Sequence, residues 1–196
     1  EQVIKRSRFI AQVFPVQDEV SLENALQAVQ TTYADATHVC YAFRCGLVNE
    51  LMRFNDAGEP GGTAGRPILE VIEREGLRNT LVTVTRYYGG MKLGAAGLVR
   101  AYSSSAAAGV AAAGRATYML HEEYQMKIEY PDWGRVERLL EEVGARMADV
   151  QYGAAVSARI FVPLSVSEAL LNRLRDASGG SIQYHLEGEK YYPVAH

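Results

Sequence analysis

Residues 83–102 constrain the fold more than any other stretch of this chain. They begin as a strand rich in β-branched residues, break at Gly89 and Gly90, and continue as a helix from near Gly94. The helix, over residues 95–113, consists mostly of Ala, Ser and Gly, and a helix with so few large side chains packs its backbone closely against a neighbour. The stretch therefore predicts a buried strand, a tight glycine turn and a helix lying on a sheet.

The glycine turn also predicts an anion-binding site. A helix N-terminus presents unpaired backbone N–H groups and the positive end of the helix dipole. Residues 76–120 contain no Asp or Glu, so the charges around the turn are all positive. The basic cluster Lys5, Arg6 and Arg8 widens this surface if its strand is adjacent, which the sequence leaves open. We expect an anion- or nucleic-acid-binding surface that includes Arg8, Arg86, Tyr87, Tyr88, Gly89, Gly90, Lys92, Gly94 and Arg100.

The order of the predicted elements indicates an α+β fold with two domains. Residues 1–118 alternate short strands with amphipathic helices and end in the small-residue helix. From residue 119 the order becomes β-α-β-β-α-β, the ferredoxin-like split motif. Its helices are predicted to open at Pro131 and at a capping box formed by Ser165 and Glu168. We therefore place one domain at 1–118 and a second at 119–196.

Composition favours a protein of the reducing cytoplasm. Hydrophobic residues make up 48% of the chain and charged residues 22%, which is ordinary for a soluble globular protein, and no apolar run is long enough to span a membrane. Cys40 and Cys45 lie on opposite faces of one predicted strand, so they cannot pair there. The net charge is −3, and the acidic excess falls in residues 119–196. The first domain is therefore the better candidate to bind an anionic partner.

A long Gly- and Pro-rich loop over residues 55–67 is a second functional candidate, because loops of this length in compact domains are usually functional or disordered. Its candidate residues are Asp56, Glu59 and Thr63. The ligand spacing of a zinc site is absent. His38 and Cys40, two residues apart on a strand, do not readily form the hydrogen bond of a nucleophile–base pair. We predict no metal, no cofactor and no catalytic residue.

Four separated motifs, in this order, closely resemble the YigZ/IMPACT family: KRSRFIA (residues 5–11), DATHVC (35–40), GEPGGTAG (58–65) and TRYYGGMKLG (85–94). The resemblance implies that the first domain is similar to one shared by a small-subunit ribosomal protein and elongation factor G. It also implies that the second domain resembles a C-terminal domain of elongation factor G. Eukaryotic members regulate translation under amino-acid starvation by competing for a ribosome-associated activator of a kinase. The resemblance thus implies a link to translation and the stress response.

Three interpretations of the glycine turn follow. We favour a cytoplasmic regulatory protein that contacts RNA or a ribosome-associated protein through the turn. The alternative is an enzyme acting on a phosphorylated small molecule or nucleotide, by analogy with small-molecule kinases in which such a turn holds phosphates. No Walker motif supports that analogy. In the third interpretation the glycines only form a tight strand-to-helix connection.

Overall fold

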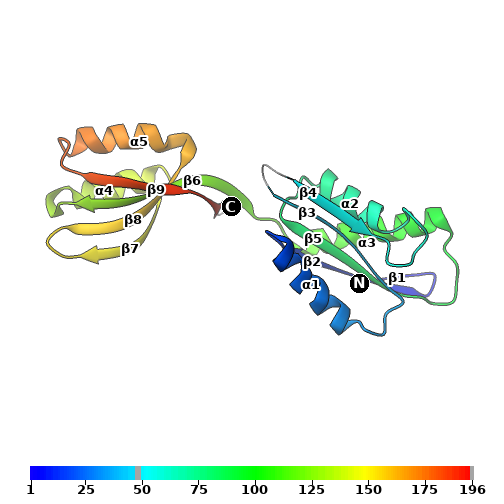
Figure 1. The fold of residues 1–196 in the computed structure, drawn as a ribbon. Helices are drawn as coiled ribbons and strands as arrows, with labels where there is room; N and C mark the ends of the chain where they lie inside the picture. Colours follow the sequence, from blue (N-terminus) through cyan, green and yellow to red (C-terminus); the bar gives the residue numbers. More distant parts are fainter. Residues whose placement is uncertain (47–49, 195–196) are drawn as a thin grey trace. The chain divides into compact units, whose positions relative to one another are not determined.

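The computed structural model describes residues 1–46 and 50–194, and the chain divides into two compact units, Glu1–Arg115 and Ala116–His196 (Figure 1). Each unit contains one antiparallel sheet packed against helices, so the predicted α+β class is confirmed. Within the described residues, no helix combines the length and apolarity needed to cross a membrane.

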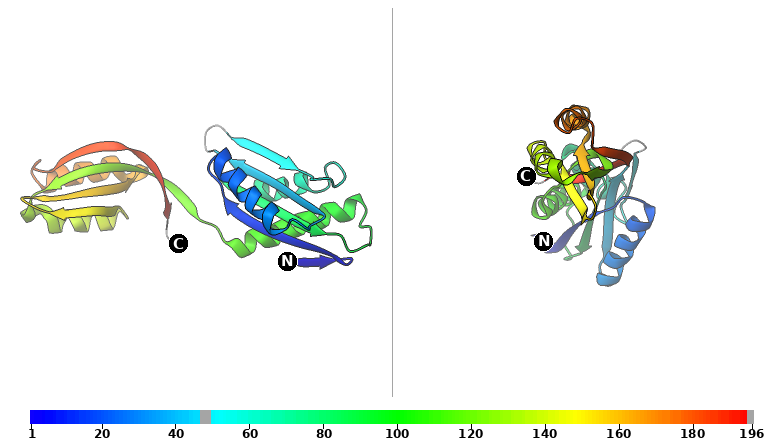
Figure 2. Two further views of the ribbon diagram at one scale, coloured as in Figure 1. Left: turned by 60° about the horizontal axis from the view of Figure 1, so that its bottom comes forward. Right: turned by 90° about the vertical axis from the view of Figure 1, so that its left-hand side faces the viewer.

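The first unit is built on a five-stranded sheet. In spatial order its strands are β1 (Gln2–Ile4), β2 (Ser7–Pro15), β5 (Thr80–Tyr87), β3 (His38–Cys45) and β4 (Leu51–Asn55). The central strand β5 is buried along almost its whole length. Helices α2 (Gly65–Arg74) and α3 (Ala95–Ala113) pack on one face of this sheet, and α1 (Glu19–Thr32) lies on the other (Figures 1 and 2). The bounds of α3 are those predicted, and β5 is the buried strand expected before the glycine turn.

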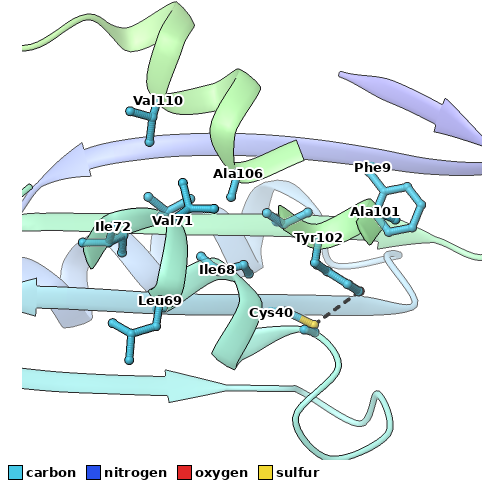
Figure 3. Packing of buried hydrophobic residues seen from close by; sticks show 14 of the residues in the cluster. Phe9, Cys40, Ile68, Leu69, Val71, Ile72, Ala101, Tyr102, Ala106 and Val110 are labelled. Carbon is cyan, nitrogen blue, oxygen red and sulfur yellow. Dashed lines mark hydrogen bonds between the residues drawn. The ribbon is translucent and has the colours of Figure 1, made fainter. Parts of the chain in front are cut away.

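The core between the sheet and helices α2 and α3 shows why α3 has so few large side chains. Ala101 and Ala106 of α3 face Ile68 of α2 across this core (Figure 3). A Cβ added to Gly109 would lie 2.8 Å from the Cβ of Ala11 on β2, closer than two such carbons normally approach. The predicted close packing of this helix on a sheet is therefore confirmed.

Two features of the first unit differ from the sequence prediction. Strand β1 was not expected, because it has three residues and its two-residue turn contains neither Gly nor Asn. The loop predicted over residues 55–67 ends earlier, because helix α2 begins at Gly65, where the carboxylate of Asp56 accepts the N–H groups of Ala64 and Gly65. Pro67 fits in the first turn of this helix, where no intrahelical N–H bond is needed.

The second unit has the predicted β-α-β-β-α-β order. Its elements are β6 (Thr117–Ile128), α4 (Tyr130–Glu142), β7 (Arg146–Tyr152), β8 (Val156–Pro163), α5 (Leu164–Ala177) and β9 (Gln183–Val194). The strands lie in the order β7-β8-β6-β9, and both helices cover one face (Figure 2). Met126 and Ile160 of the sheet pack there with Leu140 of α4 and Leu170 of α5.

Two features of the second unit differ from the sequence prediction. The alternation of apolar and polar residues that predicts this first strand begins only at Tyr124, whereas β6 begins at Thr117, because its first half pairs with the end of β9 as far as Val194. Helix α5 begins at Leu164, one residue before the predicted cap, and has no side-chain cap. Ser167 is instead buried, with its hydroxyl 3.2 Å from that of Tyr124.

The second unit has its own core, so we expect residues 116–196 to fold alone with a cooperative thermal transition. A fragment that starts at Tyr124 lacks the part of β6 that pairs with the end of β9, and should melt at a lower temperature. Circular dichroism of both fragments checks this. A fragment 116–196 without a cooperative transition would contradict the predicted independence of the second domain.

Candidate anion-binding site

Four of the elements that carry the motifs meet at one end of the first sheet. Strand β5 ends at Tyr87, where its antiparallel neighbours β2 and β3 begin: Tyr87 lies opposite Arg8, and Arg86 lies opposite His38. Strand β4 ends at the same side, and a Cβ added to Gly65 at the start of α2 would touch the backbone of Asn55. Segments far apart in the sequence therefore form a single site.

Glu59 lies at the centre of this end and is 8% exposed. Its Oε1 accepts hydrogen bonds from Arg86 Nη1 at 2.5 Å and from the hydroxyl of Tyr102 at 2.8 Å. His38 Nε2 lies 3.9 Å from the same oxygen. The carboxylate thus joins the Gly- and Pro-rich loop to strand β5 and helix α3 through a buried ion pair.

Cys40 and Tyr102 extend this buried cluster (Figure 3). The Cys40 Sγ lies 3.4 Å from the Tyr102 hydroxyl and 3.0 Å from the carbonyl oxygen of Asp56. Burial raises the pKa of the Cys40 thiol to about 12, and burial also raises the pKa of Tyr102. Both groups stay protonated at neutral pH, and a protonated thiol is a poor nucleophile. Cys40 is therefore a packing residue in this arrangement.

Asp56 holds the loop in shape. Its carboxylate accepts backbone N–H groups of Gly62 at 2.9 Å, Ala64 at 3.0 Å and Gly65 at 2.8 Å. Burial acts to raise the pKa of Asp56, but these three hydrogen bonds outweigh it and hold the pKa below its ordinary value. The hydroxyl of Thr63 donates to the carbonyl of Pro60 at 2.7 Å. The N-terminus of α2 is thus already occupied by an anion of the chain itself.

The glycine turn after β5 touches the β1–β2 turn backbone to backbone. A Cβ on Gly89 would lie 2.0 Å from the carbonyl oxygen of Arg6, so only glycine fits. The Oγ of Ser7 accepts the N–H of Gly89 and Arg86 Nη2, both at 3.2 Å. Gly94, with φ of 72°, starts α3 without a side-chain cap. The first N–H groups of α3 therefore donate no hydrogen bond to a capping side chain.

Arg86 corrects the sequence interpretation, which made it a surface cation. It is 5% exposed and lies on the face of β5 that carries Val82 and Val84, because side chains alternate along a strand. Its charge balances the buried Glu59 and does not face solvent. Arg86 therefore belongs to the framework that supports the surface.

Two other predicted residues also have partners within the chain. Arg8 forms a two-point ion pair with Glu1, with its Nε 2.7 Å from Oε1. Tyr87 donates its hydroxyl to Asp35 at 2.7 Å, and the Arg8 guanidinium lies over its ring. These contacts engage the charge of Arg8 and the hydroxyl of Tyr87, so Arg8 contributes no free charge to the surface.

Lys92, Arg100 and Tyr88 face solvent as predicted. Both cations are exposed, and no partner for either is recorded among residues 1–46 and 50–194. Tyr88 is 46% exposed and has the Arg86 guanidinium 5.3 Å from its ring centroid. Gly90, with φ of 81°, lies in the turn between Tyr88 and Lys92. The exposed part of the site is therefore smaller than predicted, and it is cationic with one aromatic ring.

The sequence interpretation missed two residues that organise the site. Tyr102 is the only large polar side chain in the small-residue helix after residue 100, and this isolation was an available signal. Ser7 lies within the basic motif of residues 5–11, where the sequence interpretation considered only the charged residues. Nothing in the sequence shows that its hydroxyl accepts two hydrogen bonds. Within the described residues, no three His, Cys, Asp or Glu side chains cluster in a way that could hold a metal ion.

Comparison with known proteins gives consistent matches over both units. Residues 5–110 match the Impact N-terminal domain, and residues 126–181 match a domain of unknown function, DUF1949. The chain is 33% identical to the IMPACT family member YvyE of Bacillus subtilis, over 98% of this chain and 88% of that protein. It is 31% identical to the IMPACT family member YigZ of Escherichia coli, over 92% of this chain and 89% of that protein. A solved structure described as that of a hypothetical protein is 31% identical, with a TM-score of 0.58, and covers 93% of this chain and 90% of its own.

The buried ion pair predicts a large effect of Arg86 on stability. Arg86→Ala leaves the Glu59 carboxylate buried without its partner, which should lower the free energy of unfolding by about 3–5 kcal/mol. Arg8→Ala, which breaks an exposed ion pair on the neighbouring strand, should change it little. Urea denaturation of both variants measures the difference. Equal, small losses would mean that Arg86 is solvated.

Asp56 predicts a pH-dependent contribution to stability. Because its folded-state pKa lies below the unfolded value, its charge stabilises the fold above about pH 4, and this contribution is lost as pH falls through the folded pKa. Asp56→Asn should therefore be less stable than wild type at neutral pH. The difference should shrink as the solution is acidified. Denaturant titrations at neutral and acidic pH test this, and a difference independent of pH contradicts it.

Proposed function

Because this chain belongs to the IMPACT family, we propose that it is a translation-associated regulatory protein that contacts RNA through the glycine turn between β5 and α3. Family membership suggests a translation-related regulator in general. The finer proposal, RNA as the partner and the turn as the contact, rests on the site. We place this activity in the cytoplasm, where translating ribosomes are found.

One observation carries the proposal: the charges facing solvent at the turn are positive and have no partner in the described part of the chain, while the acidic groups beside it are engaged. Glu59 is paired with Arg86, and Asp56 is bound to backbone amides. Lys92 and Arg100 remain exposed. Phosphates bind such cations together with the free N–H groups of a helix start. Tyr88 adds an exposed ring on which an unpaired base can stack.

The enzyme alternative receives less support from the geometry. A phosphoryl-transfer or hydrolytic site needs a base within reach of the bound phosphate. The Cys40 thiol has a pKa of about 12, the Glu59 carboxylate is buried in an ion pair, and the Asp56 carboxylate already accepts three N–H groups. These groups build the site, and none is free to take a proton from a substrate.

Removing the exposed cations tests the proposal. Each phosphate contact with a single strand contributes about −0.7 to the slope of log K against log salt concentration. Lys92→Ala/Arg100→Ala should therefore flatten the slope by about 1.4 and weaken binding about 25-fold near 0.1 M salt. Fluorescence anisotropy with labelled oligouridylate of about 12 nucleotides, at about 50 and 200 mM salt, measures both.

A matched control changes two exposed cations of the second unit, Lys127 and Arg138, to Ala. This control removes the same net charge, but from the second unit. If the cations of the glycine turn bind the RNA, the affinity of the control should stay close to that of wild type. Thermal unfolding of each variant shows whether its fold is intact. Wild-type protein that fails to bind the oligonucleotide, or equal losses in both double variants, would contradict RNA binding at this turn.

A further inference from the structure

The turn of the β1–β2 hairpin combines backbone strain with positive charge. Ile4 and Ser7 are paired strand residues, so the turn consists of Lys5 and Arg6, with φ of 44° and 63°. A two-residue turn with positive φ at both positions strongly favours Asn-Gly or Asp-Gly, because other side chains are disfavoured in this conformation. This chain has two long basic residues there. Strained backbone of this kind persists where its surroundings hold it, and it gathers at functional sites.

The surroundings hold this hairpin on both strands. The carbonyl of Arg6 touches Gly89, and Ser7 accepts the N–H of Gly89. On β1, the Oε1 of Gln2 lies within hydrogen-bonding distance of the hydroxyls of Ser104 and Ser105 on α3, at 3.1 and 3.3 Å. The hairpin is thus fixed to the two elements that flank it, the glycine turn and helix α3.

Exposed cations lie on both of the turns that touch. Lys5 and Arg6 are exposed, and no partner for either is recorded in the described part of the chain. Two residues further on, Arg8 is already neutralised by Glu1. Lys92 lies three residues beyond the contact, on the glycine turn. Both turns that meet in this backbone contact therefore carry exposed cations.

We propose that the hairpin turn and the glycine turn form one phosphate clamp that takes the backbone of single-stranded RNA, with Lys5 and Arg6 on one side and Lys92 on the other. This inference rests on the proposed RNA binding at the glycine turn. A single nucleotide is held by one turn alone, whereas consecutive phosphates of a strand contact both. The clamp thus selects a strand over a mononucleotide, without reading its sequence.

The strained turn allows a test in which stability and binding move in opposite directions. Lys5→Asn/Arg6→Gly removes both charges and installs the residue pair that this turn favours. The variant should melt about 2–5 °C higher than wild type, because the strain is relieved. It should bind oligouridylate about 25-fold more weakly near 0.1 M salt, with a salt slope flatter by about 1.4. Unchanged affinity in the more stable variant would overturn the clamp.

Three further variants separate charge from backbone effects. Lys5→Gln/Arg6→Gln keeps the strained backbone and should lose the same affinity, and it decides the question if the Asn-Gly variant proves unstable. Lys5→Arg/Arg6→Lys keeps both charges and should bind within about twofold of wild type, since phosphate contacts need charge and position only. The double variant of Lys127 and Arg138 controls for net charge. If the charge-conserving hairpin variant or the Lys127 and Arg138 variant loses as much affinity as the Gln variant, the assignment to the hairpin charges is overturned.

The same titrations distinguish failure of the clamp from failure of the proposed function. If wild type does not bind the oligonucleotide, RNA binding itself is wrong. If Lys92→Ala/Arg100→Ala weakens binding but the hairpin variants do not, RNA binding stands and the clamp is wrong. Uridine monophosphate should compete poorly even at an equal concentration of phosphate groups. Competition as strong as that of unlabelled oligonucleotide would overturn the preference for a strand.

Discussion

The buried ion pair between Arg86 and Glu59 is the interaction on which the rest of the site depends. A charge taken out of water destabilises the fold unless a partner of opposite sign and further hydrogen bonds surround it. Glu59 meets this requirement with Arg86 and Tyr102, and the two Nη atoms of Arg86 donate to Glu59 and Ser7. These contacts reach a loop, the central strand, helix α3 and the start of β2. A local electrostatic requirement thus determines how four segments that are distant in the sequence meet.

This arrangement also explains how a chain with a net charge of −3 presents a positive surface. The carboxylates at this end of the sheet are engaged inside the protein: Glu59 in its ion pair, and Asp56 on the first amides of α2. Helix α3, which follows the glycine turn, has no comparable side chain at its start. The inward carboxylates therefore leave the exposed cations of this end, Lys92 and Arg100 among them, to contribute to the local field.

Much of the fold could be predicted from the sequence, because it is encoded in local patterns. The β-branched run of β5 predicted a buried strand, and the small residues of α3 predicted a helix with the bounds that the structure shows. The errors arose where a distant partner decides the local structure. Asp56 starts α2 from nine residues away, β9 extends β6 to Thr117, and the start of α5 at Leu164 replaces an apparent capping box. Secondary-structure propensities depend only on residues that are close in the sequence, so they carry no information about these distant contacts.

The site was only partly predictable for a related reason. The sequence located the glycine turn and its cations. Without knowledge of a buried partner, however, every arginine in a sequence is interpreted as a surface charge. Whether Arg86 points inward depends on the phase of β5 and on the presence of Glu59 opposite, 27 residues earlier in the chain. The same holds for Gly89. Because it has no side chain, the backbone of Arg6 can approach it closely, and it also forms part of the turn. A glycine in such a position allows two backbone segments to touch, and only the folded chain shows which segment contacts the glycine.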